Sequence, residues 1–382
     1  MAELGVSVAG LRFSHPVLAG PGPGTDGAQA IEAALEGGAA GAVTRTIFAR
    51  PAPPPPEPSL VPYGSDGLLS AQAGSPLGLQ AWLHRELPGA AQAARRHGAP
   101  LIASLAGSPE EVRQVGRELV AAGAQALELS TFFLEWPQAV EAARELRAAV
   151  EVPIWAKLSL THGEDVAERA RTLEPYVDAF TCMAGFGPVL DLDVEAGGKP
   201  RLGGTWGYGW LSGAPVHPIA ARAVFEVARR VRRPVIASGG AMTARDVVEF
   251  LEVGASLVQV TAAVLLRGPG VLGELARGLS EWLDGHGRHS VQEVCGLYVK
   301  RFGHGQRVVT VAEEAPRLVE ERCVRCSVCE TVCFYDALVA PRRQLPVIDP
   351  ARCFQCGLCV SVCPTDALLF RPREAVTMLP PP

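Results

Sequence analysis

Apolar residues follow two alternating patterns along most of the chain. Short continuous apolar runs, typical of strands buried on both faces, alternate with longer segments whose apolar residues recur at helical spacing. The runs lie at 17–19, 42–44, 101–104, 126–129, 154–157, 179–181, 235–238 and 257–260. The clearest helical segments lie at 28–36, 109–122, 218–230 and 243–253. This order predicts parallel strands joined by helical crossovers.

Eight such units within roughly 270 residues match a closed (β/α)8 barrel, the TIM barrel. A doubly wound open sheet is the alternative for the same alternation. The number of units favours the barrel. In a barrel, binding and catalytic side chains follow the carboxyl ends of the strands. We therefore expect an α/β protein whose functional residues lie just after these runs.

Two segments break the alternation. Residues 50–64 are rich in proline, which predicts an extended loop. Residues 185–213 are rich in glycine and contain Trp206, Tyr208 and Trp210. The second segment predicts either a packed surface loop or a lid over the catalytic face.

Eight of the ten cysteines form two runs with one spacing, C-x2-C-x2-C-x3-C. The runs are Cys323, Cys326, Cys329, Cys333 and Cys353, Cys356, Cys359, Cys363. They are offset by 30 residues, and the same offset relates Asp336-Ala337-Leu338 to Asp366-Ala367-Leu368. This repetition indicates a small duplicated module with pseudo-twofold symmetry.

The spacing is typical of ferredoxin-like domains with two [4Fe–4S] clusters, in which the fourth cysteine of each run binds the other cluster. We therefore assign one cluster to Cys323, Cys326, Cys329 and Cys363, and the other to Cys353, Cys356, Cys359 and Cys333. Structural zinc sites use pairs of C-x2-C rather than runs of four. Disulfides need an oxidising compartment, which nothing in the sequence indicates.

The composition limits the remaining choices. Of the 382 residues, 48% are hydrophobic, and the net charge of −5 gives no basis for nucleic-acid binding. We see no signal peptide and no apolar stretch of membrane-spanning length, which together with the cysteine usage predicts a cytoplasmic protein. We expect a barrel at 1–285, a linker or arm at 286–316, the two-cluster domain at 317–372 and a tail at 373–382.

Glycine and hydroxyl residues follow the last two strands. Ser238-Gly239-Gly240 ends the seventh run, where glycine lets the backbone approach an anion and the next helix presents its positive N-terminus. Val260-Thr261 ends the eighth run, and Ser212-Gly213 can add amide donors. Loops after strands seven and eight are where such barrels hold a phosphate. These residues predict a phosphate-binding end.

Two cations lie on the same predicted face. Lys157 ends the fifth run among apolar residues, and Arg45 follows the second run. A lysine at this position either points into the mouth of the barrel, where it needs polar partners, or reaches solvent from the strand end. Its place on the rim favours the first interpretation.

These motifs resemble those of dihydroorotate dehydrogenases and, with the cysteine module, the flavin-and-ferredoxin portion of dihydropyrimidine dehydrogenase. The resemblance covers nearly the whole chain and implies that the barrel binds FMN. It also implies that Lys157 contacts the flavin ring and stabilises negative charge on the reduced form. The implied FMN contacts are Ala19, Gly20, Thr44, Arg45, Ser70, Lys157, Thr181, Ser212, Gly213, Ser238, Gly239, Gly240, Val260 and Thr261.

The chain departs from the family where a pyrimidine would be held. The family's Asn-Leu-Ser-Cys-Pro after strand four is Ser130-Thr131-Phe132-Phe133-Leu134 here, so the cysteine acting as acid or base is missing. The family's Thr-Asn-Thr after strand six is Thr181-Cys182-Met183. Candidates for the missing proton-transfer group are Ser130, Thr131, Cys182 and His162, each of which could instead be structural. Lys157, Cys182 and Ser130 are the catalytic candidates.

Three functions fit these features. The first is an FMN and iron–sulfur oxidoreductase subunit that passes electrons between the flavin and two [4Fe–4S] clusters and acts on a CH–CH group of a molecule other than a standard pyrimidine. The second is a true dihydropyrimidine or dihydroorotate dehydrogenase with a different acid. The third is a pure electron-relay subunit, which a flavin face covered by Phe132, Phe133 and tryptophan would favour.

A partner is expected for the first and third functions. The chain has no G-x-G-x-x-G motif between a strand and a helix, so it lacks the usual dinucleotide-binding signature. We expect an FAD- and NAD(P)H-binding partner subunit or another electron-transfer protein, and a homo- or hetero-oligomer.

Overall fold

The computed structural model describes residues 2–160, 165–302, 307–309, 315–370 and 377–379. The chain divides into two compact units, residues 1–304 and 305–382. Within the described residues, no helix has the length and apolar character needed to cross a membrane.

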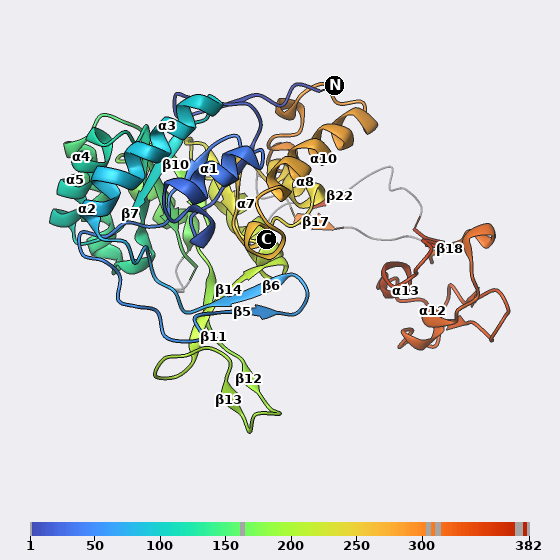
Figure 1. The fold of residues 1–382 in the computed structure, drawn as a ribbon. Helices are drawn as coiled ribbons and strands as arrows, with labels where there is room; N and C mark the ends of the chain where they lie inside the picture. The colour runs from blue at the N-terminus through green and yellow to red at the C-terminus, as the bar shows by residue number, and fades with distance from the viewer. Residues whose placement is uncertain (1, 161–164, 303–306, 310–314, 371–376, 380–382) are drawn as a thin grey trace. The chain divides into compact units, whose positions relative to one another are not determined.

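Eight parallel strands close into a barrel in the first unit, and each lies at one of the predicted apolar runs (Figure 1). In order around the barrel they are β3 (Val17–Ala19), β4 (Ala42–Val43), β7 (Leu101–Leu105), β8 (Ala126–Ser130), β9 (Ile154–Leu158), β10 (Ala179–Cys182), β15 (Val235–Ser238) and β16 (Ala255–Val260). The order in space follows the order in sequence, as expected for helical crossovers that each return to the next strand. The predicted TIM barrel is confirmed.

Helices cover the outside of the barrel (Figure 1). They are α1 (Ala28–Glu36), α3 (Leu87–His97), α4 (Pro109–Ala121), α5 (Trp136–Ala149), α6 (Val166–Leu173), α7 (His217–Ala228), α8 (Ala244–Glu252) and α10 (Val271–Gly285). Every residue of β7, β8, β9, β10 and β15 is buried, because helices cover one face of each strand and the barrel interior covers the other. Polar residues in these strands must therefore find partners inside the barrel.

An antiparallel sheet lies beside the barrel in the same unit (Figure 1). Its strands are β11 (Phe186–Leu190), β14 (Tyr208–Gly213), β6 (Gly67–Ser70) and β5 (Leu60–Tyr63), and the hairpin of β12 (Leu192–Asp193) and β13 (Lys199–Pro200) projects from it. The predicted loop over 50–64 is therefore wrong for its last residues, because β5 satisfies its backbone by pairing with β6. β6 pairs with β5 on one side and with β14 on the other, so it connects the two irregular segments of the sequence.

The first unit also contains the hairpin of β1 (Val6–Val8) and β2 (Leu11–Phe13) and the short helices α2 (Leu79–Ala81), α9 (Ala262–Arg267) and α11 (Leu297–Phe302). α9 begins directly after Thr261, at the carboxyl end of β16. It therefore lies on the rim where the phosphate-binding residues were predicted.

The second unit is built from a repeated short pattern. Its elements are β17 (Arg307–Val309), β18 (Arg317–Leu318), α12 (Val328–Thr331), β19 (Leu338–Val339), β20 (Val347–Ile348), α13 (Leu358–Ser361), β21 (Leu368–Leu369) and β22 (Thr377–Leu379). β18 pairs with β21, and β19 pairs with β20. Leu338 and Leu368, from the two copies of Asp-Ala-Leu, are buried in its small core.

Left-handed backbone conformations repeat with the same offset as the cysteines. Arg325 and Gln355 have φ of 55° and 59°, and Asp336 and Asp366 have φ of 45° and 49°. Residues other than glycine rarely adopt this conformation, so its occurrence at matching positions indicates two copies of one backbone path. The duplication read from the sequence is thus present in the fold of the unit.

Ser108 caps the N-terminus of α4, as its position before Pro109 predicts. Its hydroxyl accepts from the amide of Glu111 at 3.3 Å, and the Glu111 carboxylate accepts from the amide of Ser108 at 2.8 Å. This reciprocal pair satisfies two amides that the helix itself leaves unbonded.

We expect Ser108→Ala to lower the free energy of unfolding of the barrel unit by about 1 kcal/mol, because one capping bond is lost. All six tryptophans lie before residue 305, so their fluorescence during urea unfolding reports on this unit alone. The matched control is Ser7→Ala, at an exposed position in β1. Equal effects of the two substitutions would contradict a capping role.

Candidate active site

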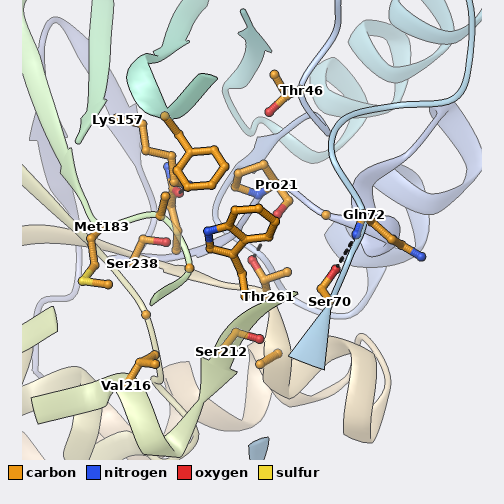
Figure 2. A pocket seen from close by; sticks show the side chains of 18 of the residues that line it. Pro21, Thr46, Ser70, Gln72, Lys157, Met183, Ser212, Val216, Ser238 and Thr261 are labelled. Atoms are coloured by element: carbon orange, nitrogen blue, oxygen red, sulfur yellow. Dashed lines mark hydrogen bonds between the residues drawn. The ribbon is translucent and has the colours of Figure 1, made fainter. Parts of the chain in front are cut away.

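One cavity lies at the carboxyl ends of the barrel strands (Figure 2). Ser130 ends β8, Lys157 lies near the end of β9, and Ser238 ends β15, so separate strands bring these side chains to one rim. Residues of the antiparallel sheet, among them Ser70 and Trp210, also line the cavity. This is the face on which barrels of this type carry their sites.

Lys157 is buried in the mouth of the barrel and is only 7% exposed. Its ammonium group donates to Oε1 of Gln259 at 2.9 Å and lies 3.5 Å from Oε1 of Glu128. Oε2 of Glu128 accepts hydrogen bonds from Gln259 Nε2 at 2.6 Å and from Thr181 Oγ1 at 2.8 Å. This Glu128–Lys157 network joins β8, β9, β10 and β16 inside the barrel.

The charge on Lys157 depends on this network. Burial lowers the pKa of Lys157, while the charge of Glu128 and the hydrogen bond with it act in the opposite direction. A nearby opposite charge favours the protonated form of a buried amine. An ammonium has three N–H donors, and two protein acceptors take two of them, which leaves one for a ligand.

The predicted phosphate-binding end carries unused backbone donors. Gly239, Gly240, Ala241 and Thr261 line the cavity, and their amides have no hydrogen-bond partner among the described residues. Gly240 has φ of +89°, and a Cβ there would lie 2.6 Å from the carbonyl oxygen of Gly213, so this loop and the end of β14 meet closely. Several free amides at one end of a cavity suit a phosphate group, which accepts many hydrogen bonds.

The helix after β15 does not supply the expected positive end. The carboxylate of Asp246 accepts from the amides of Met242 and Thr243, and the Thr243 hydroxyl accepts from the amide of Asp246. The N-terminus of α8 is therefore capped by its own residues. The free donors come instead from the loop before it and from Thr261, whose hydroxyl donates to the carbonyl of Pro21 (Figure 2).

Arg45 also lines the cavity, with both terminal nitrogens bonded to protein groups. Nη1 lies 2.8 Å from Oδ2 of Asp26, and Nη2 lies 3.1 Å from Oε1 of Gln72. The other oxygen of Asp26 accepts from Ser75 Oγ at 2.6 Å. The guanidinium charge is thus paired with a carboxylate that has its own supporting donor.

Aromatic rings form one wall of the cavity. Phe132 and Phe133 lie in the 3-10 turn after β8, with their ring centroids 5.0 Å apart at 86°. Phe132 meets Trp210 at 5.1 Å and 82°, and Phe133 meets Phe48 at 5.1 Å and 74°. Edge-to-face packing of this kind fixes ring positions. Phe132, Phe133 and Trp210 all line the cavity.

Most of the predicted site residues meet at this cavity. Those that line it are Arg45, Ser70, Ser130, Lys157, Ser212, Gly213, Ser238, Gly239, Gly240 and Thr261. Those that do not are Ala19, Gly20, Thr44, Thr181, Cys182 and Val260. Thr44 and Thr181 are fully buried and bond to Ser104 and Glu128 respectively, so they support the rim from within.

The candidates for proton transfer differ in whether their side chains reach the cavity. Cys182 is fully buried, and burial raises the pKa of its thiol far above the usual range. The Thr131 hydroxyl donates to the backbone carbonyl of Lys157 at 2.7 Å. His162 lies outside the described residues. Ser130 lines the cavity, and its hydroxyl has no partner in the described part of the chain.

Glu128 and Gln259 were not predicted as site residues. Both lie in apolar runs that were assigned as strands, and both side chains point into the barrel interior, where they bond to Lys157. A polar residue inside such a run is the signal that could have identified them, since it must have a partner. Only the barrel geometry shows that Glu128 and Gln259 bond to each other.

In the second unit, the eight cysteines surround two separate cavities. Cys323, Cys326, Cys329 and Cys363 line one, and Cys333, Cys353, Cys356 and Cys359 line the other. Each group combines three cysteines of one run with the fourth of the other. Within the described residues, no group of ligating side chains is close enough to hold a single metal ion, whereas a cubane binds each thiolate at a different iron.

Cys363 has the surroundings of a thiolate ligand. Burial raises the pKa of its thiol, but amides of Thr365, Ala367 and Leu368 and the Thr365 hydroxyl more than offset this, so the pKa lies below its usual value. The amide of Ala367 donates to the sulfur at 3.2 Å. Amide donors to sulfur are the common surroundings of iron–sulfur ligands.

Both units of the chain are similar to known protein families. Residues 3–283 match the family model described as dihydroorotate dehydrogenase, and residues 346–369 match a 4Fe-4S binding domain. Over 314 residues the chain is 30% identical to dihydroorotate dehydrogenase B (NAD(+)), catalytic subunit, of Thermoplasma acidophilum, which covers 78% of this chain and 100% of that protein.

Two further relatives cover a similar share. The chain is 35% identical to a putative dihydroorotate dehydrogenase A (fumarate) of Aeropyrum pernix over 77% of this chain and 97% of that protein. It is 32% identical to dihydroorotate dehydrogenase B (NAD(+)), catalytic subunit, of Pyrococcus abyssi over 78% and 99%.

The barrel, its cavity and the cysteine-rich unit define a flavin-dependent oxidoreductase of the FMN type with an iron–sulfur domain. The chain belongs to the dihydroorotate dehydrogenase family. The resemblance to dihydropyrimidine dehydrogenase finds no specific support in these matches.

The Glu128–Lys157 network predicts strong coupling between the two charges. We expect Lys157→Met to lower the free energy of unfolding of the barrel unit by about 3–5 kcal/mol, because it leaves a buried carboxylate without its cation. Lys157→Met combined with Glu128→Gln should cost much less, since no buried charge is left unpaired. Tryptophan fluorescence during urea unfolding of the FMN-free chain measures both. Additive effects would contradict the coupling.

Proposed function

We propose that the chain is an electron-transferring subunit that binds one FMN in the barrel and two [4Fe–4S] clusters in the cysteine-rich unit. It acts on a CH–CH group of a small molecule in the barrel cavity and exchanges single electrons with a partner. FMN, when bound, supplies the conversion between two-electron and one-electron chemistry. The barrel cavity carries this proposal, because it combines free amides, one available ammonium donor and an aromatic wall.

The residues of the cavity fit FMN at two places. The free amides of Gly239, Gly240 and Thr261 would hold the phosphate, as at other anion sites built from backbone donors. The remaining N–H of Lys157 would face the ring and favour added negative charge there. Ser70 and Ser212 line the same cavity and would supply further hydroxyl donors.

Ser130 is the proposed proton-transfer residue. Lys157 and Arg45 are the only ionisable side chains among the described residues that line the cavity, and both are paired with carboxylates. Ser130 is the direct neighbour of Lys157 in the β8–β9 register, and a cation near its hydroxyl would stabilise a developing alkoxide. Cys182, without access to the cavity, is proposed to be structural.

Two cubanes fit the cysteine cavities. Each cavity has four thiols, and a single [4Fe–4S] cluster requires four ligands. We propose crossed ligation, with Cys363 completing the first cluster and Cys333 the second.

The partner is proposed to be an FAD- and NAD(P)H-binding subunit or another electron-transfer protein. Relatives of the chain carry the name catalytic subunit, which refers to a larger assembly in those proteins. Clusters in addition to the flavin give this chain a means of exchanging single electrons with such a partner.

Oxidation of dihydroorotate is the second candidate function, and the names of the relatives favour it. In that case Ser130 would replace the family's cysteine. The alternative of an electron relay without substrate is favoured by the aromatic wall, since Phe132, Phe133 and Trp210 could cover the flavin.

Purification under anaerobic conditions tests the proposal. We expect about one FMN and about eight irons with acid-labile sulfide per chain, from two four-iron clusters. A preparation without flavin would refute it, and about four irons would refute the two-cluster assignment. Oxidation of dihydroorotate by the purified protein would favour the second candidate.

Paired cysteine substitutions test the crossed ligation. We expect Cys323→Ala with Cys363→Ala to leave about four irons, because both residues belong to one cluster. Cys353→Ala with Cys363→Ala should remove both clusters. The two variants lack the same number of thiols, so each controls for the other. The opposite result would show that each run binds its own cluster.

A further inference from the structure

The cavity has two chemically different ends that lie across the barrel from each other. β15 and β16 carry the free amides, and β7 and β8 occupy the opposite side of the ring of strands. The turn with Phe132 and Phe133 directly follows β8. If the amide end binds a phosphate, the aromatic end is left for a second molecule.

The cavity carries no unpaired cation among the described residues. Lys157 is paired with Glu128, and Arg45 is paired with Asp26 at 2.8 Å. The carboxylates of these pairs lie behind the lining, and the Arg45 and Asp26 side chains are only 10% and 14% exposed. An anionic ligand at the aromatic end would therefore lose its hydration without gaining an unpaired positive charge.

Few hydrogen-bonding side chains among the described residues remain free at the aromatic end. The amide side chain of Gln72 is used on both sides, since its oxygen accepts from Arg45 and its nitrogen donates to Ser59 Oγ at 2.9 Å. The indole Nε1 of Trp210 is buried and has no hydrogen-bond partner in the described part of the chain. With the Ser130 hydroxyl, it gives this end two unused donors, and the described side chains there leave no carboxylate or amide acceptor free.

The aromatic wall, the paired cations and the unused donors together favour one kind of ligand. Flat aromatic walls favour a flat apolar molecule, and unused donors favour a hydrogen-bond acceptor such as a carbonyl oxygen. A pyrimidine ring presents several donors and acceptors around its edge, which the described side chains at this end do not match. Unmatched polar groups cost binding energy when they are buried.

We propose that the aromatic end of the cavity binds planar, uncharged, largely apolar carbonyl compounds, of the class of aryl-conjugated enones. This inference rests on the proposed function, because it assigns the substrate class of the same site. It differs from the second candidate function, which requires a charged pyrimidine carboxylate.

Ligand titration of the anaerobic, FMN-loaded protein tests the inference. The probes are benzylideneacetone as a planar uncharged enone, uracil as a planar uncharged pyrimidine, and orotate as a planar anion. Changes in flavin absorbance measure dissociation constants. We expect benzylideneacetone to bind at least about tenfold more tightly than either pyrimidine, because it gains aromatic and apolar contacts at the wall.

Matched variants test whether the aromatic wall causes this binding preference. Trp210→Leu and Phe132→Leu should each weaken enone binding about tenfold. Trp206→Leu removes an indole from the same segment, but Trp206 is 69% exposed and does not line the cavity, so binding should not change. The enone dissociation constant is measured for all three variants with FMN bound.

The outcomes separate this inference from the proposed function. A protein that carries FMN and clusters but binds orotate or uracil as tightly as the enone refutes the substrate class alone. A loaded protein that binds none of the probes also refutes it and favours the relay. A protein without FMN refutes the proposed function itself.

Discussion

The site depends on a buried ion pair inside a closed barrel. The strands that close the barrel bury Lys157 and Glu128, so each charge must be compensated by the other and by Gln259. Removing one partner leaves an uncompensated charge, which is why such pairs cannot be changed singly at low cost. The network also fixes where the ammonium points. Its position on the wall of the cavity connects the stability of the barrel to its chemistry.

Around this ion pair, backbone groups and side chains line different parts of the cavity. Unused amides after β15 and at Thr261 offer fixed dipoles, and fixed dipoles need no reorganisation when an anion binds. The opposite wall consists of rings held edge to face, which offer shape and apolar surface but little polarity. Because both cations are paired, the field in the cavity comes mainly from backbone and single hydroxyl groups.

The second unit shows how a short sequence repeat produces crossed cavities. Matching left-handed residues, such as Arg325 and Gln355, curve each run around its cavity. The fourth cysteine follows a short helix, α12 or α13, which carries it to the other cavity. The repeated Ala-Leu pairs then fill the small core between the copies. Such a small core is usual in units that gain much of their stability from bound metal clusters.

The sequence by itself determined the eight strands, the closed barrel and the grouping of cysteines, because these depend on local periodicity and spacing. It also placed Lys157, Ser130 and Gly239 on one rim, since strand ends in a barrel share one face. Only the tertiary structure paired Glu128 with Gln259, which lies 131 residues further along the chain. Tertiary packing also decided that α8 caps itself with Asp246, that Arg45 meets Asp26, and that Cys182 is removed from the cavity. These outcomes depend on which side chains meet across closed strands, and no pattern of neighbouring residues specifies such distant contacts.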